Sequence, residues 1–302
     1  MKQAKSIGYE AQKARWGWFF VAPALIFFSI FSFYPILNAL WTSLFDKKLL
    51  SLKPPAFIGL GNYIRVLGGP EFWNSVVATG IFTLGAFIPL VGLSLFLAVL
   101  ISSRSRFQRG LQLLFYSPAV LSSVVAALIW MLMFDPRGLA NQGLNALLNQ
   151  PGVDRRWLSD VSMVRISTII VYVWKYIGYF TILYITGISK IPRSVIEAAK
   201  IDGATNLNQF RYIVFPLLKP TTVLVSIMVM IQCLKTFSTQ YLFTQSGAPT
   251  GPIDVITLNI YNTAMRDLNI GRASVMSVIL FLIMLLLTGL QLRFSKSEDV
   301  TF

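Results

Sequence analysis

Long apolar runs alternate with short polar segments along this chain of 302 residues. A helix that crosses a membrane needs about 20 consecutive apolar residues. Runs of at least this length predict six spans, at approximately 17–44, 74–102, 111–134, 166–188, 219–243 and 273–293. The longest runs exceed one bilayer crossing, so they must tilt or extend into water. The pattern predicts an all-α, polytopic membrane protein with one membrane domain over residues 1–302.

The polar segment 187–220 separates the fourth and fifth runs, and it is predicted to form two short helices joined by a turn. Pro192 suits a first helical turn, and Gly203 stands where a glycine commonly ends a helix. Asn206 and Gln209 resemble a capping box at the start of the second helix. Apolar positions fall at helical spacing in both halves: Val195, Ile196, Ala198, Ala199 and Ile201, then Phe210, Ile213, Val214 and Leu217.

Three other polar loops are predicted on the opposite side of the membrane, at 46–71, 135–165 and 246–271. The second of them contains leucines that predict a short surface helix, namely Leu139, Leu144, Leu147 and Leu148.

Composition and charge give the orientation of these segments. The chain is 55% hydrophobic and only 13% charged, which excludes an ordinary soluble domain. Its net charge of +14 is therefore interpreted as membrane topology, and no nucleic-acid partner is expected. If both termini are cytosolic, the inside segments hold 14 basic residues against 10 outside, and five acidic residues against seven. The short loop 103–110 has three basic residues and no acidic one. This charge bias predicts that the segment 187–220 is cytosolic.

Several classes of chemistry are disfavoured by what the sequence lacks. It has no histidine, and its one cysteine, Cys233, lies within a span. No GxxxxGK[ST] phosphate-binding loop occurs, so any ATP must be bound by another chain. No Asp or Glu falls inside the six predicted spans, which counts against an ion-gradient-driven secondary transporter and against a membrane enzyme. The apolar core of the first span is longer than the 7–15 residues of a signal peptide, so we expect it to be retained.

Two lysines lie within predicted spans. A lysine there costs about 2.5–3.5 kcal/mol on insertion scales, so it needs a wet cavity, a partner or a short path to the interface. Lys175 either snorkels to the outer interface or approaches a hydrophilic cavity. Lys235 lies deeper, in the middle of the fifth span. A cation on the path would favour an acidic solute, such as a uronate oligomer or a phosphorylated polyol, but the sequence alone favours a neutral saccharide.

Polar and aromatic residues surround these lysines at helical spacing. On the fifth span they are predicted to share one face: Gln232, Lys235, Thr236, Thr239 and Gln240. On the fourth span, Tyr172, Tyr176 and Tyr179 do the same. Amides, hydroxyls and aromatic rings suit the hydroxyls and C–H faces of a sugar. The alternative is that they join helices within the bundle.

The segment 187–220 also carries a family resemblance. Glu197-Ala198-Ala199, three residues, Gly203, nine residues and then Ile213-Val214-Phe215-Pro216 resembles the EAA motif of ABC importer permeases. Ile191-Pro192 and Ile201-Asp202-Gly203-Ala204 are similar to the carbohydrate-importer branch, of the maltose and glycerol-phosphate type. The resemblance extends to Trp174-Lys175-Tyr176-Ile177-Gly178-Tyr179 and to Thr244-Gln245-Ser246-Gly247-Ala248-Pro249. It covers essentially the whole chain.

The resemblance implies a transmembrane permease subunit, of the first-permease type, in an ATP-driven sugar importer of the bacterial inner membrane. The coupling loop 189–219 would contact a cytosolic ATPase through Glu197, Ala198, Ala199, Asp202, Gly203, Ile213 and Pro216. The implied or predicted substrate contacts are Tyr176, Tyr179, Gln232, Cys233, Lys235, Thr236, Thr239 and Gln240. Expected partners are a second EAA-containing permease, an ATPase dimer that binds ATP and Mg²⁺, an extracytoplasmic solute-binding protein and membrane lipid. The chain itself is expected to hold no cofactor or metal and not to be an enzyme.

Overall fold

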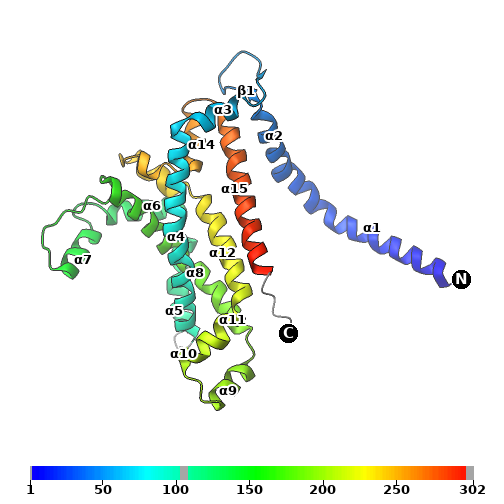
Figure 1. Ribbon diagram of the computed structural model, residues 1–302, viewed down its shortest axis with the longest axis vertical. Coiled ribbons are helices and arrows are strands. Elements are labelled where there is room, and N and C mark those ends of the chain that lie inside the picture. The colour runs from blue at the N-terminus through cyan, green and yellow to red at the C-terminus, as the bar shows by residue number, and fades with distance from the viewer. Residues whose placement is uncertain (1, 103–107, 297–302) are drawn as a thin grey trace. The chain divides into compact units, whose positions relative to one another are not determined.

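The computed structural model describes residues 2–102 and 108–296, which are predominantly helical (Figure 1). Arg104 and Arg106, which carry much of the charge predicted for the loop 103–110, lie outside the described residues. The chain divides into two compact units. One consists of the residues up to Gly68 together with Ile260–Ile279, and the other of Gly69–Asn259 together with the residues from Leu280 onward. Each unit is described by itself.

The first unit begins with a long apolar helix. It runs through α1 (Lys2–Phe28), a π-helical turn η1 (Ser29–Phe33) and α2 (Tyr34–Thr42). The stretch Gln12–Thr42 is long and apolar enough to cross a membrane, and none of its most apolar 18-residue window is buried inside the chain. Its aromatic side chains therefore contact lipid or another protein.

A short hairpin follows this helix. Strand β1 (Phe45–Asp46) pairs antiparallel with β2 (Ala56–Phe57), and α3 (Gly61–Gly68) comes next. The buried Asn62 amide donates to the backbone oxygens of Ser43 and Phe45, at 3.0 and 2.9 Å. Because these bonds join the hairpin to α3, the predicted outer loop 46–71 has a defined conformation.

Three helices form the core of the second unit: α4 (Pro70–Ser102), α8 (Val161–Ser189) and α12 (Lys219–Leu234). They pack side by side (Figure 1). Ser94 of α4 donates to the Ile177 carbonyl of α8, at 3.1 Å. The core is filled by apolar and aromatic side chains that include Phe82, Leu90, Phe180, Tyr184, Val225 and Val229.

The third apolar run is bent. It forms α5 (Gln108–Val120) and α6 (Ser123–Met133), which meet at an angle of 99°. Pro118 cannot donate a backbone hydrogen bond, and Ser122 caps the next helix by accepting from the Val125 amide at 3.2 Å. The predicted span over 111–134 therefore consists of two apolar helices joined at a sharp bend.

The remaining elements of the described chain are mostly helices. They are α7 (Leu139–Leu148), α9 (Arg193–Ile201), α10 (Asn206–Gln209), π turn η2 (Phe210–Val214), α11 (Phe215–Leu217), α13 (Ser238–Gln245), 3-10 turn η3 (Gly251–Ile253), α14 (Ile256–Met265) and α15 (Ile270–Lys296). Five described helical stretches are long and apolar enough to cross a membrane, or six if the bent pair is one span. The all-α polytopic class is confirmed, and α7 is the surface helix predicted from its leucines.

Candidate functional site

The polar loop between α8 and α12 contains the turn that the sequence predicted. Helix α9 ends at Ile201, and Gly203 has a φ of +77°. The Gly203 amide donates to the Lys200 carbonyl at 3.1 Å, and the Ala204 amide donates to the Ala199 carbonyl at 2.9 Å. These two bonds define a Schellman motif, in which glycine adopts the left-handed conformation at no steric cost. Gly203 is therefore the helix-ending glycine that was predicted.

The second half of the loop differs in detail from the prediction. The N-cap of α10 is Thr205, whose hydroxyl accepts from the Asn208 amide at 3.3 Å, so the capping box assigned to Asn206 and Gln209 is wrong. Gln209 is buried instead and donates to the Ala204 carbonyl at 2.9 Å. The π turn η2 then interrupts the helix. The predicted apolar face is retained across this turn, because all its members are half-buried: Phe210, Ile213, Val214 and Leu217.

Exposed side chains gather on both sides of the Gly203 turn. Glu197 and Ala198 are exposed, whereas Ala199 is buried. Ile201 is 86% exposed and Leu207 is 73% exposed. Ile201 and Leu207 thus present apolar surface on either side of the turn. Of the other predicted coupling residues, Asp202 and Pro216 are exposed and Ile213 is half-buried.

Behind α9 lies a groove of about 460 Å³. It is lined by the ends of α4, α5 and α8 and by one face of α9, including Arg193, Glu197 and Lys200. No ion pair joins Glu197 to another residue in the described part of the chain. Glu197 is exposed, so its carboxylate can contact an external partner.

A second, polar cavity of about 260 Å³ lies within the second unit. It is formed by the start of α6, the middle of α8, the end of α12 and the start of α13. Five of the predicted substrate contacts line it: Tyr176, Gln232, Lys235, Thr236 and Thr239. The other lining residues are Ser123, Val171, Tyr172, Lys175, Phe237 and Ser238. The structure therefore brings together polar residues of three separate apolar runs.

Lys175 points into this cavity. Its side chain is only 6% exposed, and Nζ donates to Ser123 Oγ at 2.6 Å. The same nitrogen lies 5.1 Å from the centroid of the Tyr176 ring, within range of a cation–π interaction. The alternative that Lys175 snorkels to the outer interface is wrong, because its ammonium is buried beside α6. Lys175 was absent from the predicted substrate contacts, although its spacing from Tyr172 and Tyr179 on α8 placed it on the same face.

The fifth span is broken where the cavity lies. Helix α12 ends at Leu234, the chain leaves helical geometry at Lys235–Phe237, and α13 begins at Ser238. The single helical face predicted from Gln232 to Gln240 is therefore wrong. Non-helical backbone within a membrane is tolerated where it lines a cavity or is buried in protein. Here the Thr236 carbonyl accepts from the Thr257 hydroxyl, which satisfies one of the freed backbone groups.

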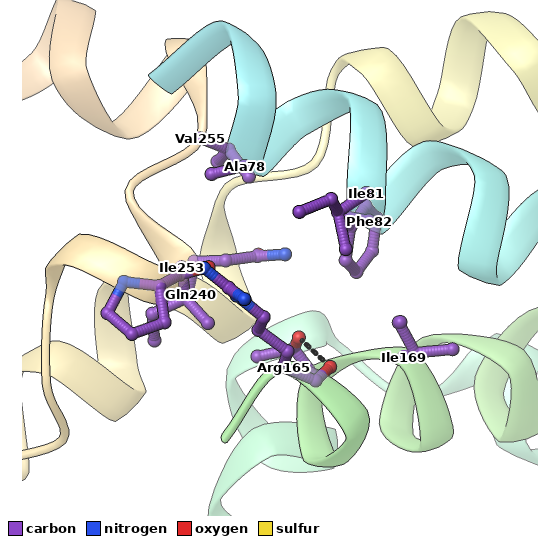
Figure 2. Close-up of a pocket in the computed structure, with 10 residues that line it drawn as sticks. Ala78, Ile81, Phe82, Arg165, Ile169, Gln240, Ile253 and Val255 are labelled. Carbon is purple, nitrogen blue, oxygen red and sulfur yellow. Dashed lines mark hydrogen bonds between the residues drawn. The ribbon is translucent and has the colours of Figure 1, made fainter. Parts of the chain in front are cut away.

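Three predicted substrate contacts lie away from this cavity. Cys233 is fully buried in the core, and Tyr179 packs against Phe180 with ring centroids 5.1 Å apart. Gln240 is also fully buried, and its Oε1 accepts from Thr236 Oγ1 at 3.0 Å. Figure 2 shows Gln240 beside a separate small space of about 10 Å³, with Arg165 and Phe82 around it. That space has about the volume of one water molecule.

A third hollow, of about 440 Å³, lies among the segments that were predicted to face outward. Its lining includes Asp135, Asp154 and Arg156 from the predicted outer loop 135–165, together with Gly247 and Ala248. Gly247 has a φ of +96°, so the turn in the segment 244–249 has a conformation that favours glycine. The hollow thus joins two predicted outer loops into one surface of mixed apolar and charged residues.

A comparison with protein families now assigns the class. Residues 90–299 match the family described as the binding-protein-dependent transport system inner membrane component. The chain belongs to this family. It is a multi-pass inner membrane protein and the permease component of a transport system, rather than an enzyme. The alternative of an ion-gradient-driven secondary transporter is not supported.

Relatives of known description cover nearly the whole chain. The lactose transport system permease protein LacF of Rhizobium radiobacter is 32% identical over 278 residues, which cover 91% of this chain and 92% of the relative. A probable starch degradation products permease, AmyD of Thermoanaerobacterium thermosulfurigenes, is 31% identical and covers 94% of this chain and 95% of its own length. The sn-glycerol-3-phosphate permease UgpA of Agrobacterium fabrum is 31% identical, with 92% and 94% covered.

The fold is also that of a solved importer. A chain of a bacterial ABC transporter involved in the import of the acidic polysaccharide alginate superposes with a TM-score of 0.81. The alignment covers 97% of this chain and 99% of that one, at 18% sequence identity. At this identity the likeness defines the fold alone. It confirms the fold of an ABC importer permease.

Proposed function

We propose that this chain is the transmembrane permease of an ATP-driven importer for a sugar or oligosaccharide. The observation that carries the proposal is the cavity around Lys175 and Lys235. It combines hydroxyls, an amide and tyrosine rings, which match the hydroxyls and C–H faces of a saccharide. Relatives described as lactose and starch-product permeases support the same solute class.

In this proposal the loop 189–219 is the site of coupling to a cytosolic ATPase dimer, which binds ATP and Mg²⁺. Ile201 and Leu207 bury their exposed apolar surface against the ATPase, and Glu197 supplies a charged contact. Closure of the ATPase dimer moves the loop, and the movement passes directly into α8 and α12, which flank it. Because these helices carry the cavity, rigid-body movement of them changes its access from one side of the membrane to the other.

The remaining partners complete the transport unit. A second permease with its own EAA loop pairs with this chain, as the first-permease type requires. The hollow near Gly247 receives an extracytoplasmic solute-binding protein, and a solved relative of the fold is described in complex with a ligand-bound periplasmic protein. Both termini are cytosolic in this arrangement, which the charge bias of the sequence supports.

The coupling role is tested by Glu197→Lys in the complete importer, reconstituted in proteoliposomes. Glu197 is exposed and unpaired within the described chain, so the change leaves the permease fold intact. We expect uptake to fall strongly while the permease remains in the membrane at normal levels. Asp267→Lys is the matched control, because Asp267 is an exposed acid in a predicted outer loop. Undiminished uptake by Glu197→Lys would refute the coupling role.

A further inference from the structure

The cavity around Lys175 and Lys235 carries an uncompensated positive charge. Two of its lining residues are lysines, and no Asp or Glu is among the described residues that line it. An ion placed in a low-dielectric site is costly unless an opposite charge compensates it. Two like charges beside one cavity also repel each other. A neutral solute would leave the buried charge of Lys175 without an opposite charge and would not reduce its repulsion with Lys235.

Lys175 keeps donors available for a ligand. A lysine ammonium has three N–H donors, and within the described parts of the chain one polar acceptor, Ser123 Oγ, contacts it. The Tyr176 ring provides weak stabilisation at 5.1 Å. Lys235 lies at the break in the fifth span, where its exposed side chain lines the same cavity. A purely structural role for Lys175 would not require a second lysine there.

The rest of the lining identifies the remainder of the solute. Gln232 lines the cavity and contributes a side-chain amide, a group that hydrogen-bonds to hydroxyls. Thr236, Thr239 and Ser238 add hydroxyl groups. The cavity therefore combines anion-binding and polyol-binding groups.

We propose that this cavity selects an anionic saccharide or polyol, whose carboxylate or phosphate binds the ammonium groups of Lys175 and Lys235. The inference rests on the proposed function and names the solute class for that same cavity. Charge-assisted hydrogen bonds are stronger than those between neutral groups. The lysines therefore discriminate against a neutral saccharide of the same size.

The test is direct binding to the purified complete importer without its solute-binding protein, so that only the permease selects. Equilibrium dialysis uses three radiolabelled probes: neutral maltotriose, trigalacturonate as the carboxylate and sn-glycerol 3-phosphate as the phosphate. We expect at least one anionic probe to bind about tenfold or more tightly than maltotriose, and more weakly as salt is raised. The anionic probe that binds more tightly shows whether the cavity recognises a carboxylate or a phosphate.

Lys235→Gln should weaken binding of the anionic probe by about 10- to 100-fold, the range expected for losing one hydrogen bond to a charged group. Lys235→Arg should retain most of it. Lys175→Arg and Lys175→Gln repeat the comparison at the buried site, where assembly is checked by gel filtration. Lys53→Gln, an exposed lysine in a predicted outer loop, should change nothing.

The inference is overturned if maltotriose binds as tightly as both anionic probes, or if anion binding is unchanged in Lys235→Gln and in the assembled Lys175→Gln. Failure of both anionic probes to bind overturns it as well. The proposed function is judged separately by uptake into ATP-loaded proteoliposomes supplied with the binding protein. Uptake of a neutral saccharide alone keeps the proposed function and overturns the inference, whereas uptake of no saccharide refutes the proposed function itself.

Discussion

The turn at Gly203 gives a prediction whose magnitude follows from the structure. A side chain built on Gly203 would meet no other atom within 4 Å, so a substitution causes no clash inside the chain. The cost comes instead from the φ of +77°, because the left-handed conformation costs an ordinary residue about 1–2 kcal/mol. That cost is similar to the net stabilisation from one exposed backbone hydrogen bond, about 0.5–1.5 kcal/mol. A substitution should therefore open the turn locally without unfolding the permease.

The comparison of Gly203→Val with Gly203→Asn separates strain from contact with the ATPase. Val is β-branched and unsuited to a positive φ, whereas Asn adopts it several times more often than most residues. Hydrogen–deuterium exchange of the amides of Asp202–Ala204 should rise by about 5- to 30-fold in Gly203→Val, the factor that corresponds to 1–2 kcal/mol. The amount of ATPase that co-purifies should fall in parallel. Gly203→Asn should retain most of the amide protection and most of the bound ATPase.

The opposite pattern would refute this reasoning. Suppose that co-purification of the ATPase falls equally in Gly203→Asn and Gly203→Val, while amide exchange in both variants matches the wild type. The substitutions then do not strain the turn. The glycine would then be required because any side chain collides with the docked partner.

Two further predictions concern packing and ionisation. In Gly178→Ala, the new methyl group would meet the backbone of Phe115 and lie 2.8 Å from the Tyr116 nitrogen. The solubilised protein should therefore be less stable by about 1–3 kcal/mol, which a fall in its thermal midpoint would show. The control is Gly80→Ala in α4, where the new methyl group would meet no atom within 4 Å and should cause no loss of stability. Burial raises the pKa of Asp254 from 3.8 to about 6, and the nearby Glu71 adds to the rise while a hydrogen bond from Asn259 opposes it. The folded state therefore binds the proton of Asp254 more tightly than the unfolded state, so stability should fall as pH rises from 3.8 to about 6. Thermal melts of Asp254→Asn should lose this pH dependence. If the pH profile of the variant matches that of the wild type, Asp254 is not the group responsible.

Much of the membrane architecture could be predicted from the sequence because a bilayer imposes a simple requirement on length and polarity. The expected run 166–188 corresponds to the span Val161–Ser189, and 273–293 corresponds to Ile270–Phe294. The bend between α5 and α6 had a signal in Pro118, but proline also occurs inside α4, at Pro89, without such a break. The local residue type alone therefore does not decide where a span bends.

The break at Lys235–Phe237 had no comparable signal. No glycine or proline occurs there. The irregular backbone is stabilised by the Thr257 hydroxyl, which comes from 21 residues further along the chain, so only the folded chain shows this contact. For the same reason Ser123 was not among the candidate residues, because it approaches Lys175 from a different apolar run. Periodicity identified the polar residues of each helix, whereas the cavity depends on how separate helices meet.

The same break has a mechanical consequence. Helix α12 has 16 residues and begins directly after the coupling loop, so it is a rod about 24 Å long. A tilt of about 5° at the loop would move the far end of such a rod by about 2 Å. In a continuous span that displacement would be carried on into α13, but here it ends at a joint beside Lys235. Under the proposed function, motion of the loop would therefore be concentrated where the cavity is lined, because α13 beyond the joint packs on α6 and α8.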